Sequence, residues 1–383
     1  MRMRHIIVLF AFLSIYIANL TLATAAPTLI PAPPHVAAKA YLLIDHNSGR
    51  ILAEHNADKR IEPASLTKLM TAYVVFYEIE RGGISLDDEV KISEKAWRMG
   101  GSRMFIKVNS MVSVKDLLKG LIIQSGNDAS VALAEHVANN EASFVELMNQ
   151  HAERLNMNAT HFNNSTGWPD KNHYTTVRDL AKLTQAIIND FPKHYSTYKE
   201  KEYTYNNIRQ YNRNRLLWLD DRVDGLKTGH TDAAGYCLIT SAKQNNMRLI
   251  SIVTGTDKDA TRISASRKLL NYGFRFFETH LIYQANTEIT NMRVWKGEDE
   301  KLSLGISKNL YVTTPKGSRR KIKNNIKVEA MIEAPATKGT SYGQLNIILE
   351  DKTIATQDLI ALNTVNEGGF WRKLSDNIQL MFQ

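Results

Sequence analysis

The chain has 383 residues, of which 43% are hydrophobic and 23% are charged, so it is long enough for two ordinary domains with well-buried cores. Its single cysteine, Cys237, excludes an intramolecular disulfide and a cysteine metal cluster. The formal net charge is +9, yet the longest basic run is Arg319-Arg320-Lys321, so we expect no nucleic-acid partner. The charge reflects either a solvated basic face or attraction to anionic polymers and phospholipid head groups.

The start of the chain, positions 1–25, has the layout of a cleaved secretory signal peptide. Arg2 and Arg4 precede an apolar run at positions 6–17, and small side chains at 23–25 precede the expected mature start at Ala26. Cleavage would lower the net charge by two, to +7. The alternative is an uncleaved anchor helix, but polar side chains shorten the apolar run below the ~20 residues that a membrane span needs.

The predicted elements begin with a β-hairpin made by residues 40–45 and 50–54. An apolar helix follows at residues 65–80, which is hydrophobic on nearly every side and stops at Gly82-Gly83, as a buried central helix would. Residues 85–191 show a helical pattern. Three capping boxes mark helix starts within it, at Ser113, Ser125 and Thr176.

A polar, turn-rich stretch at residues 156–174 predicts an ordered loop between the helices. Strand patterns return at 235–242 and 247–255, and a long helix is expected at 261–278. After Thr279 short alternating runs indicate a separate small β domain. The expected fold class is therefore α/β, an antiparallel sheet with an all-α insert, followed by a β-rich domain.

The last segment, residues 370–382, predicts an amphipathic helix. At 100° per residue its apolar side chains fall within an arc of ~120°. These side chains are Phe370, Trp371, Leu374, Ile378, Met381 and Phe382. The segment is too short and too polar to span a bilayer but suits lying in its interface. The alternative is that it docks onto the protein's own domains.

Three short clusters carry the chemistry: Ser65-Leu66-Thr67-Lys68, Ser125-Gly126-Asn127 and Lys227-Thr228-Gly229. A lysine three positions after a serine on a helix points its amine at the same face, where it can take the proton of the serine hydroxyl. An exposed lysine with a pKa near ~10.4 stays protonated, so Lys68 can be a base only if its apolar helix desolvates it. Ser-x-x-Lys alone arises often by chance, and the two clusters that follow support the active-site interpretation.

The second and third clusters fit the rest of an acyl-transfer site. Ser125 can relay a proton to the leaving amine and Asn127 can donate to a substrate amide, although Ser125 alone would be interpreted as a helix cap. Lys227 and Thr228 precede an edge-type strand near residue 235, along which an extended peptide can pair, and they can bind its terminal carboxylate. The N–H groups of Ser65 and His230 can form an oxyanion hole, with no catalytic role for the His230 imidazole.

These clusters, in this order, resemble the signature of class A β-lactamases and penicillin-binding proteins, with SGN in place of SDN. Further similar stretches lie at residues 213–218, 224–231, 234–236 and 275–279, and after Gly368-Gly369. Over nearly its whole length the chain resembles the D-alanyl-D-alanine carboxypeptidases, the membrane-anchored low-molecular-mass class C penicillin-binding proteins of peptidase family S11.

The resemblance implies a signal peptide at 1–25, a discontinuous transpeptidase / β-lactamase-like domain at 26–280, a β-rich domain at 281–365 and a membrane-anchor helix at 366–383. It implies that Arg262, together with the strand of Lys227, Thr228 and Gly229, holds the substrate carboxylate, the alternative being a surface arginine at a helix start. Arg213 matches an arginine near the cleft, or belongs to a solvated loop.

The implied activity is removal of the terminal D-alanine from peptidoglycan pentapeptides, with no cofactor or metal. The implied partners are stem peptides, β-lactam antibiotics and the periplasmic face of the cytoplasmic membrane, which the C-terminal helix contacts.

Two rival interpretations remain, a β-lactamase and an idle wall-binding scaffold. Class A β-lactamases use a Glu-x-x-Leu-Asn element for rapid deacylation, and the nearest string here, Glu153-Arg154-Leu155-Asn156, puts the glutamate one position late. We therefore expect no fast antibiotic hydrolysis. A scaffold would not need the serine, lysine and asparagine together.

Overall fold

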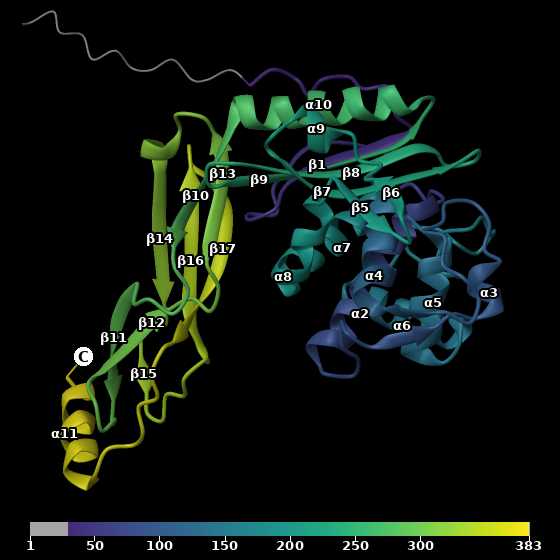
Figure 1. The fold of residues 1–383 in the computed structure, drawn as a ribbon. Coiled ribbons are helices and arrows are strands. Elements are labelled where there is room, and N and C mark those ends of the chain that lie inside the picture. Colours follow the sequence, from purple (N-terminus) through teal and green to yellow (C-terminus); the bar gives the residue numbers. More distant parts are fainter. Residues whose placement is uncertain (1–29, 383) are drawn as a thin grey trace, which may run out of the picture. The chain divides into compact units, whose positions relative to one another are not determined.

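The computed structural model describes residues 30–382, so the predicted signal peptide lies outside the described residues. A five-stranded antiparallel sheet with the order β2-β1-β9-β8-β7 organises the first part of the chain (Figure 1). Its strands are β1 (Ala40–Asp45), β2 (Ile51–His55), β7 (Val223–Thr231), β8 (Gly235–Gln244) and β9 (Met247–Thr256). The hairpin β1–β2 pairs with β9, which follows it only after a long insert, and this confirms the predicted discontinuous α/β domain.

A mainly helical insert of residues 56–222 separates β2 from β7. It contains η1 (Ala64–Thr67), α2 (Lys68–Glu80), α3 (Glu94–Trp97), α4 (Val114–Lys119), η2 (Gly120–Gln124), α5 (Asn127–Ala138), α6 (Glu141–Arg154), α7 (Val177–Asp190), α8 (Pro192–Tyr195), η3 (Ser196–Lys199) and α9 (Leu216–Leu219). Two short hairpins also belong to it, β3 (Glu89–Lys91) with β4 (Met111–Ser113) and β5 (Glu202–Tyr205) with β6 (Ile208–Tyr211). The insert is thus not purely helical.

Helices cover both faces of the five-stranded sheet. The long helix α10 (Asp259–Phe276) packs on β8 and β9, while α7 packs on β1 and β9 from the side of the insert, as Figure 1 shows. The first turn of the predicted helix at 65–80 is the 3₁₀ turn η1, and the α-helix begins at Lys68. Since side chains three positions apart eclipse in a 3₁₀ turn, this geometry brings Ser65 and Lys68 face to face.

A β-rich part follows α10, as predicted. Its six-stranded sheet has the order β14-β16-β17-β12-β11-β15, and β10 pairs with β13. The bounds are β10 (Phe277–Tyr283), β11 (Thr290–Trp295), β12 (Lys301–Gly305), β13 (Leu310–Pro315), η4 (Arg319–Lys321), β14 (Ile322–Val328), β15 (Ile332–Glu333), β16 (Ser341–Leu349) and β17 (Lys352–Ala361). Alternate apolar side chains of these strands form a core of their own, with Leu302, Leu345 and Leu359 fully buried.

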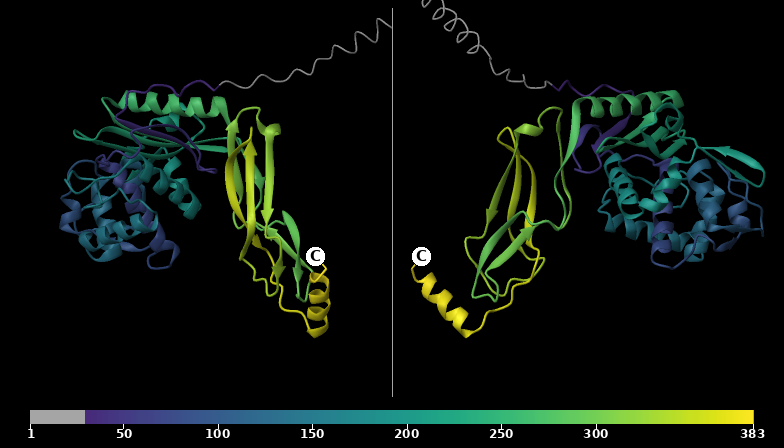
Figure 2. Two further views of the ribbon diagram at one scale, coloured as in Figure 1. Left: turned by 180° about the vertical axis from the view of Figure 1, so that it is seen from behind. Right: turned by 60° about the vertical axis from the view of Figure 1, so that its left-hand side comes forward.

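The chain ends in α11 (Phe370–Leu380), which lies against the β-rich part (Figure 2). Its contact is made by the polar face. Asp376 is fully buried and accepts hydrogen bonds from Arg293 Nη2 at 3.1 Å and from the backbone N–H of Lys296 at 2.6 Å. Arg372 pairs with the same carboxylate at 3.4 Å. Among the described residues, no helix has the length and apolar character of a membrane span.

Candidate active site

The three sequence clusters meet at one place in the fold. Ser65 lies on η1, Lys68 begins α2, Ser125 lies between η2 and α5, and Lys227 lies on β7. The Nζ atom of Lys68 is 3.1 Å from Ser65 Oγ. The Nζ atom of Lys227 donates to Ser125 Oγ at 2.7 Å. Two serine–lysine pairs therefore lie together at the site.

The Lys68 amine is held by three oxygens in a dry environment. Besides Ser65 Oγ it contacts Asn127 Oδ1 at 2.7 Å and the carbonyl oxygen of Thr166 at 2.6 Å. The side chain is 1% exposed, and this burial lowers the pKa of Lys68 to about 7. A neutral amine has two N–H groups, which Asn127 and Thr166 can both accept, and its lone pair then faces the serine hydroxyl.

The Lys227 amine is also deeply buried. It is 2% exposed, and burial lowers the pKa of Lys227 well below its usual range, helped by the charges of Lys68, Arg213 and Arg262. Its bond to Ser125 Oγ ties the third cluster to the second. The site thus contains two lysines that burial pushes toward the neutral form.

The prediction that Ser125 caps a helix is wrong. Ser125 has φ +66° and follows the π-helical turn η2, and Gly126 is the N-cap of α5, with no side-chain capping bond. The left-handed conformation lets the hydroxyl bond to Lys227 instead of turning back onto α5. The boxes at Ser113 and Thr176 are confirmed, since each hydroxyl accepts from the N–H three positions on.

Asp128, three positions after Ser125, would be the acidic residue of that predicted capping box, but it has a different role in the structure. Its buried carboxylate accepts hydrogen bonds from the backbone N–H groups of Met104, Phe105 and Ile106, at 3.0, 2.9 and 3.3 Å. A buried carboxylate needs such donors. Asp128 therefore fixes the segment that follows Gly101 and Ser102 beside the site.

The third cluster lies within a strand, not in a turn ahead of one. Lys227, Thr228 and Gly229 belong to β7, the edge strand of the sheet, whose one partner strand in the described part of the chain is β8. A side chain at residue 229 would be crowded, because a Cβ there would stand 3.2 Å from the carbonyl oxygen of Pro63 and 3.3 Å from the N atom of Leu66. Glycine thus lets β7 run directly against η1.

Two arginines bound the site on the side of β7. Arg213 Nε donates to the carbonyl oxygen of Gln124 at 3.0 Å. Arg262 is 7% exposed, so it is not the surface arginine of the alternative interpretation. Its Nη1 donates to the carbonyl oxygens of Gly229 at 3.1 Å and Cys237 at 2.9 Å, and it pairs with Asp259. Arg262 therefore braces β7 against β8.

The sequence did not single out Thr166, whose carbonyl oxygen holds Lys68. The loop around it is ordered by Asn164 Oδ1, which accepts hydrogen bonds from the N–H groups of Thr166, Gly167 and Trp168 at 3.1, 2.8 and 3.0 Å. Gly167 has φ +84°, and a Cβ there would lie 1.8 Å from the carbonyl oxygen of Ala64. The signal available in the sequence was an asparagine three positions before a glycine in a polar loop.

Two cavities of about 480 Å³ each flank these groups. The first is lined by Ser65, Asn127, Thr166, Trp168, His230 and Asp232, among others, and the second by Gln124, Tyr211, Arg213 and Arg262, among others. Within the first cavity Asp232 is the one carboxylate among the described lining residues. Glu153, the glutamate of the nearest β-lactamase-like string, is exposed at the end of α6, and no glutamate is among the described residues that line the cavity at Ser65.

A serine hydroxyl beside a buried lysine amine at the start of a buried helix, a second desolvated lysine and an edge strand are the features of an acyl-transfer enzyme of the penicillin-recognising fold. A family model described as D-alanyl-D-alanine carboxypeptidase matches residues 27–258, and one described as the C-terminal domain of penicillin-binding protein 5 matches residues 277–367. The chain belongs to the D-alanyl-D-alanine carboxypeptidase family, and its activity is that of a penicillin-binding serine carboxypeptidase.

Similar proteins agree over most of the chain. The D-alanyl-D-alanine carboxypeptidase DacA of Escherichia coli K12 is 44% identical over 363 residues, which cover 93% of this chain and 90% of that protein. Penicillin-binding protein 5 from Haemophilus influenzae has a TM-score of 0.85 at 42% identity, over 88% of this chain and 100% of that one. Penicillin-binding protein D2 from Listeria monocytogenes, in its ampicillin-bound form, has a TM-score of 0.59 at 31% identity, over 64% of this chain and 100% of that one.

Proposed function

We propose that this carboxypeptidase removes the terminal D-alanine from peptidoglycan pentapeptides through an acyl-enzyme on Ser65. The observation that carries this is the buried Lys68 amine 3.1 Å from Ser65 Oγ. In the first step Lys68 takes the hydroxyl proton while Ser65 Oγ attacks the penultimate peptide carbonyl. The N–H groups of Ser65 and His230 stabilise the oxyanion.

In the second step the amide C–N bond breaks and D-alanine leaves. Ser125 delivers a proton to its amine, and the bond from Lys227 Nζ to Ser125 Oγ supports this relay. Water then attacks the acyl-enzyme, which releases the shortened peptide and restores Ser65. Each step transfers an acyl group and protons only, so the proposed reaction uses no cofactor and no metal.

The substrate pairs as an extended strand with the outer edge of β7. Lys227, Thr228 and Gly229 are in that strand. Arg213 and Arg262 line the cavity on the leaving-group side, and these two arginines give the terminal carboxylate a positive environment. Asn127 contributes one N–H to the substrate amide, because the other amide hydrogen of its Nδ2 donates to the Gly100 carbonyl at 2.7 Å.

β-Lactams acylate the same serine, in keeping with the similar protein solved in its ampicillin-bound form. Because no glutamate is among the described residues that line the cavity at Ser65, deacylation of the penicillin adduct is slow. A fluorescent penicillin chase distinguishes the three interpretations: a long-lived adduct indicates a carboxypeptidase, rapid turnover a β-lactamase, and no adduct a scaffold.

Ser65→Ala tests the nucleophile directly. We expect it to abolish both D-alanine release and the covalent penicillin adduct seen by mass spectrometry, with unchanged thermal unfolding, because one oxygen is lost. Ser143→Ala on α6 is the matched control and keeps both activities. Penicillin labelling of the Ser65→Ala protein would refute the assignment.

We also propose the domain division predicted from the sequence: a signal peptide at 1–25, a catalytic domain at 26–280, a β-rich domain at 281–365 and an anchor helix at 366–383. The enzyme would act at the periplasmic face of the cytoplasmic membrane. Support comes from the outward apolar side chains of the C-terminal helix, with Phe370, Trp371 and Met381 71%, 78% and 82% exposed.

Leu374→Asp tests this contact, because it puts a charge in the middle of the apolar arc. We expect flotation with anionic phospholipid vesicles to fall sharply. Gln379→Glu adds the same charge on the docked face, where Gln379 already accepts from Arg293, and is the matched control. Equal flotation of the two variants would contradict the proposal.

A further inference from the structure

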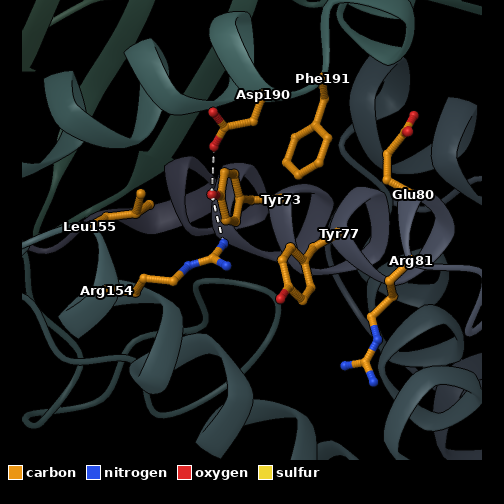
Figure 3. Close-up of a pocket in the computed structure, with 8 residues that line it drawn as sticks. All are labelled: Tyr73, Tyr77, Glu80, Arg81, Arg154, Leu155, Asp190 and Phe191. Carbon is orange, nitrogen blue, oxygen red and sulfur yellow. Dashed lines mark hydrogen bonds between the residues drawn. The ribbon is translucent and has the colours of Figure 1, made fainter. Parts of the chain in front are cut away.

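A separate cavity lies toward the C-terminal end of α2. One of its lining residues, Tyr77, is about 14 Å along the helix from Lys68, at 1.5 Å per residue. The volume of the cavity is about 440 Å³, and its lining residues are Tyr73, Tyr77, Glu80, Arg81, Arg154, Leu155, Asp190 and Phe191 (Figure 3). None of them lines the cavities at Ser65 and Arg262. The catalytic proposal above therefore does not use this site.

Two opposite charges face this cavity without pairing directly. Tyr73 donates its hydroxyl hydrogen to Asp190 Oδ2 at 2.8 Å and accepts from Arg154 Nη2 at 2.9 Å. Both Asp190 and Arg154 are exposed, and neither belongs to a salt bridge with another described residue. The Tyr73 hydroxyl group thus lies between a carboxylate and a guanidinium and is hydrogen-bonded to both.

The spacing of these charges is held by a rigid side chain. Tyr73 is 1% exposed and packs edge-on against Phe191, with ring centroids 5.0 Å apart. Burial, followed by the bond to Asp190, raises the pKa of Tyr73 to about 12, so the hydroxyl stays protonated between the two charges. The Arg154 guanidinium is fixed as well, since it stacks 4.4 Å from the Tyr77 ring centre.

The other two charged residues of the cavity, Glu80 and Arg81, are arranged in the same way as Asp190 and Arg154. In Figure 3 the carboxylates of Asp190 and Glu80 lie on one side of the two tyrosine rings, and the guanidiniums of Arg154 and Arg81 lie on the other. Glu80 and Arg81 are exposed, and their ion-pair partners, His194 and Glu78, are not among the lining residues. A simple anion would meet the two carboxylates, and a simple cation the two arginines.

We propose that this cavity binds a zwitterionic amino acid or dipeptide. Its carboxylate pairs with Arg154, its ammonium with Asp190, and its apolar part packs on Tyr77, Leu155 and Phe191. The two charged groups are joined by one α-carbon in an amino acid, and by two α-carbons and the peptide bond between them in a dipeptide, so such a ligand can bridge the two charges that Tyr73 holds apart. The choice of D-alanine as the natural occupant rests on the proposed function, whose reaction releases it beside the enzyme.

The test uses full-length protein whose Ser65 is first acylated by penicillin, so that the catalytic site is blocked. D-Alanine and D-alanyl-D-alanine are then titrated, and binding is followed by calorimetry and by backbone amide shifts of α2, α6 and α7. We expect saturable binding. N-Acetyl-D-alanine, which lacks the ammonium, and D-alaninamide, which lacks the carboxylate, should each bind at least about tenfold more weakly, because one charge-assisted contact is lost.

Arg154→Gln and Asp190→Asn should weaken D-alanine or dipeptide binding by a similar factor, while Arg98→Gln, at the residue that follows α3, should leave it unchanged. The proposal is overturned if neither zwitterion shows saturable binding, or if the charge-blocked analogues bind as tightly as the zwitterions. Neither result depends on a variant. If no penicillin adduct forms, the proposed function fails. The amide-shift titration of the protein without an adduct still decides whether the α2 cavity binds a zwitterion.

Discussion

The buried Lys68 makes a quantitative prediction about the pH dependence of acylation. A lysine accepts the serine proton only when its amine is neutral, and burial lowers the pKa of Lys68 from 10.5 to about 7. The neutral form is therefore present above pH 7 and is lost as the pH falls through 7. We expect the acylation rate to drop about tenfold per pH unit below 7 and to level off above it.

The size of the effect follows from the same shift. At pH 7 about half of a group with a pKa near 7 is neutral, against roughly three in ten thousand for an unshifted lysine, a gain on the order of 10³. Replacing the amine should slow acylation by at least ~10². Lys68→Ala removes the base, and Lys68→Arg keeps a positive charge that cannot become neutral.

Stopped-flow acylation by a chromogenic cephalosporin, measured from pH 5.5 to 8.5, would give the profile. Control measurements of far-UV circular dichroism at each pH would show that the fold persists. A rate independent of pH across this range, or near-normal acylation by the Lys68→Arg protein, would refute the neutral-lysine mechanism.

Three further outcomes follow from the packing around the site and the C-terminal helix. Arg262→Ala should lower the free energy of unfolding by about 1–3 kcal/mol for each buried carbonyl that loses its donor, and it should also slow peptide turnover. Unchanged urea unfolding would contradict the bracing role of Arg262. Gly229→Ala should push β7 away from η1 and reduce penicillin acylation, and a wild-type rate would show that the contact is tolerant. Asp376→Ala should detach α11, seen as faster hydrogen exchange at residues 370–380; unaltered exchange would mean that other contacts hold the helix.

The fold was largely predictable because its signals are local. Hydrophobic patterning indicated the β1–β2 hairpin, the buried α2 and the long α10, and the change to alternating runs after Thr279 indicated the β-rich part. The edge position of β7 was less visible, because strand order depends on pairing between segments far apart in the chain, such as β1 and β9. The motif Lys227-Thr228-Gly229 was therefore expected ahead of a strand instead of within one.

The residues of the candidate site were likewise predictable where the signal is local and not where it depends on tertiary contacts. The pairing of Ser65 with Lys68 follows from their spacing, whereas the Thr166 carbonyl is a backbone atom that no residue type announces. Ser125 was interpreted as a cap because Asp128 follows at the capping distance. The left-handed φ of Ser125 and the backbone donors that satisfy Asp128 are set by tertiary contacts, which no periodicity records.

Because α11 docks through Asp376, the helix becomes ordered when the β-rich part folds. A helix as short as α11 is marginal when it stands alone in water, but here the buried carboxylate and Arg372 fix it on folded protein. Its conformational entropy is lost when the β-rich part folds, and the lipid contact that we propose would come afterwards. On our proposal a free peptide of residues 366–383 would have to fold and bind in one event, so it should adhere to vesicles more weakly than the whole chain.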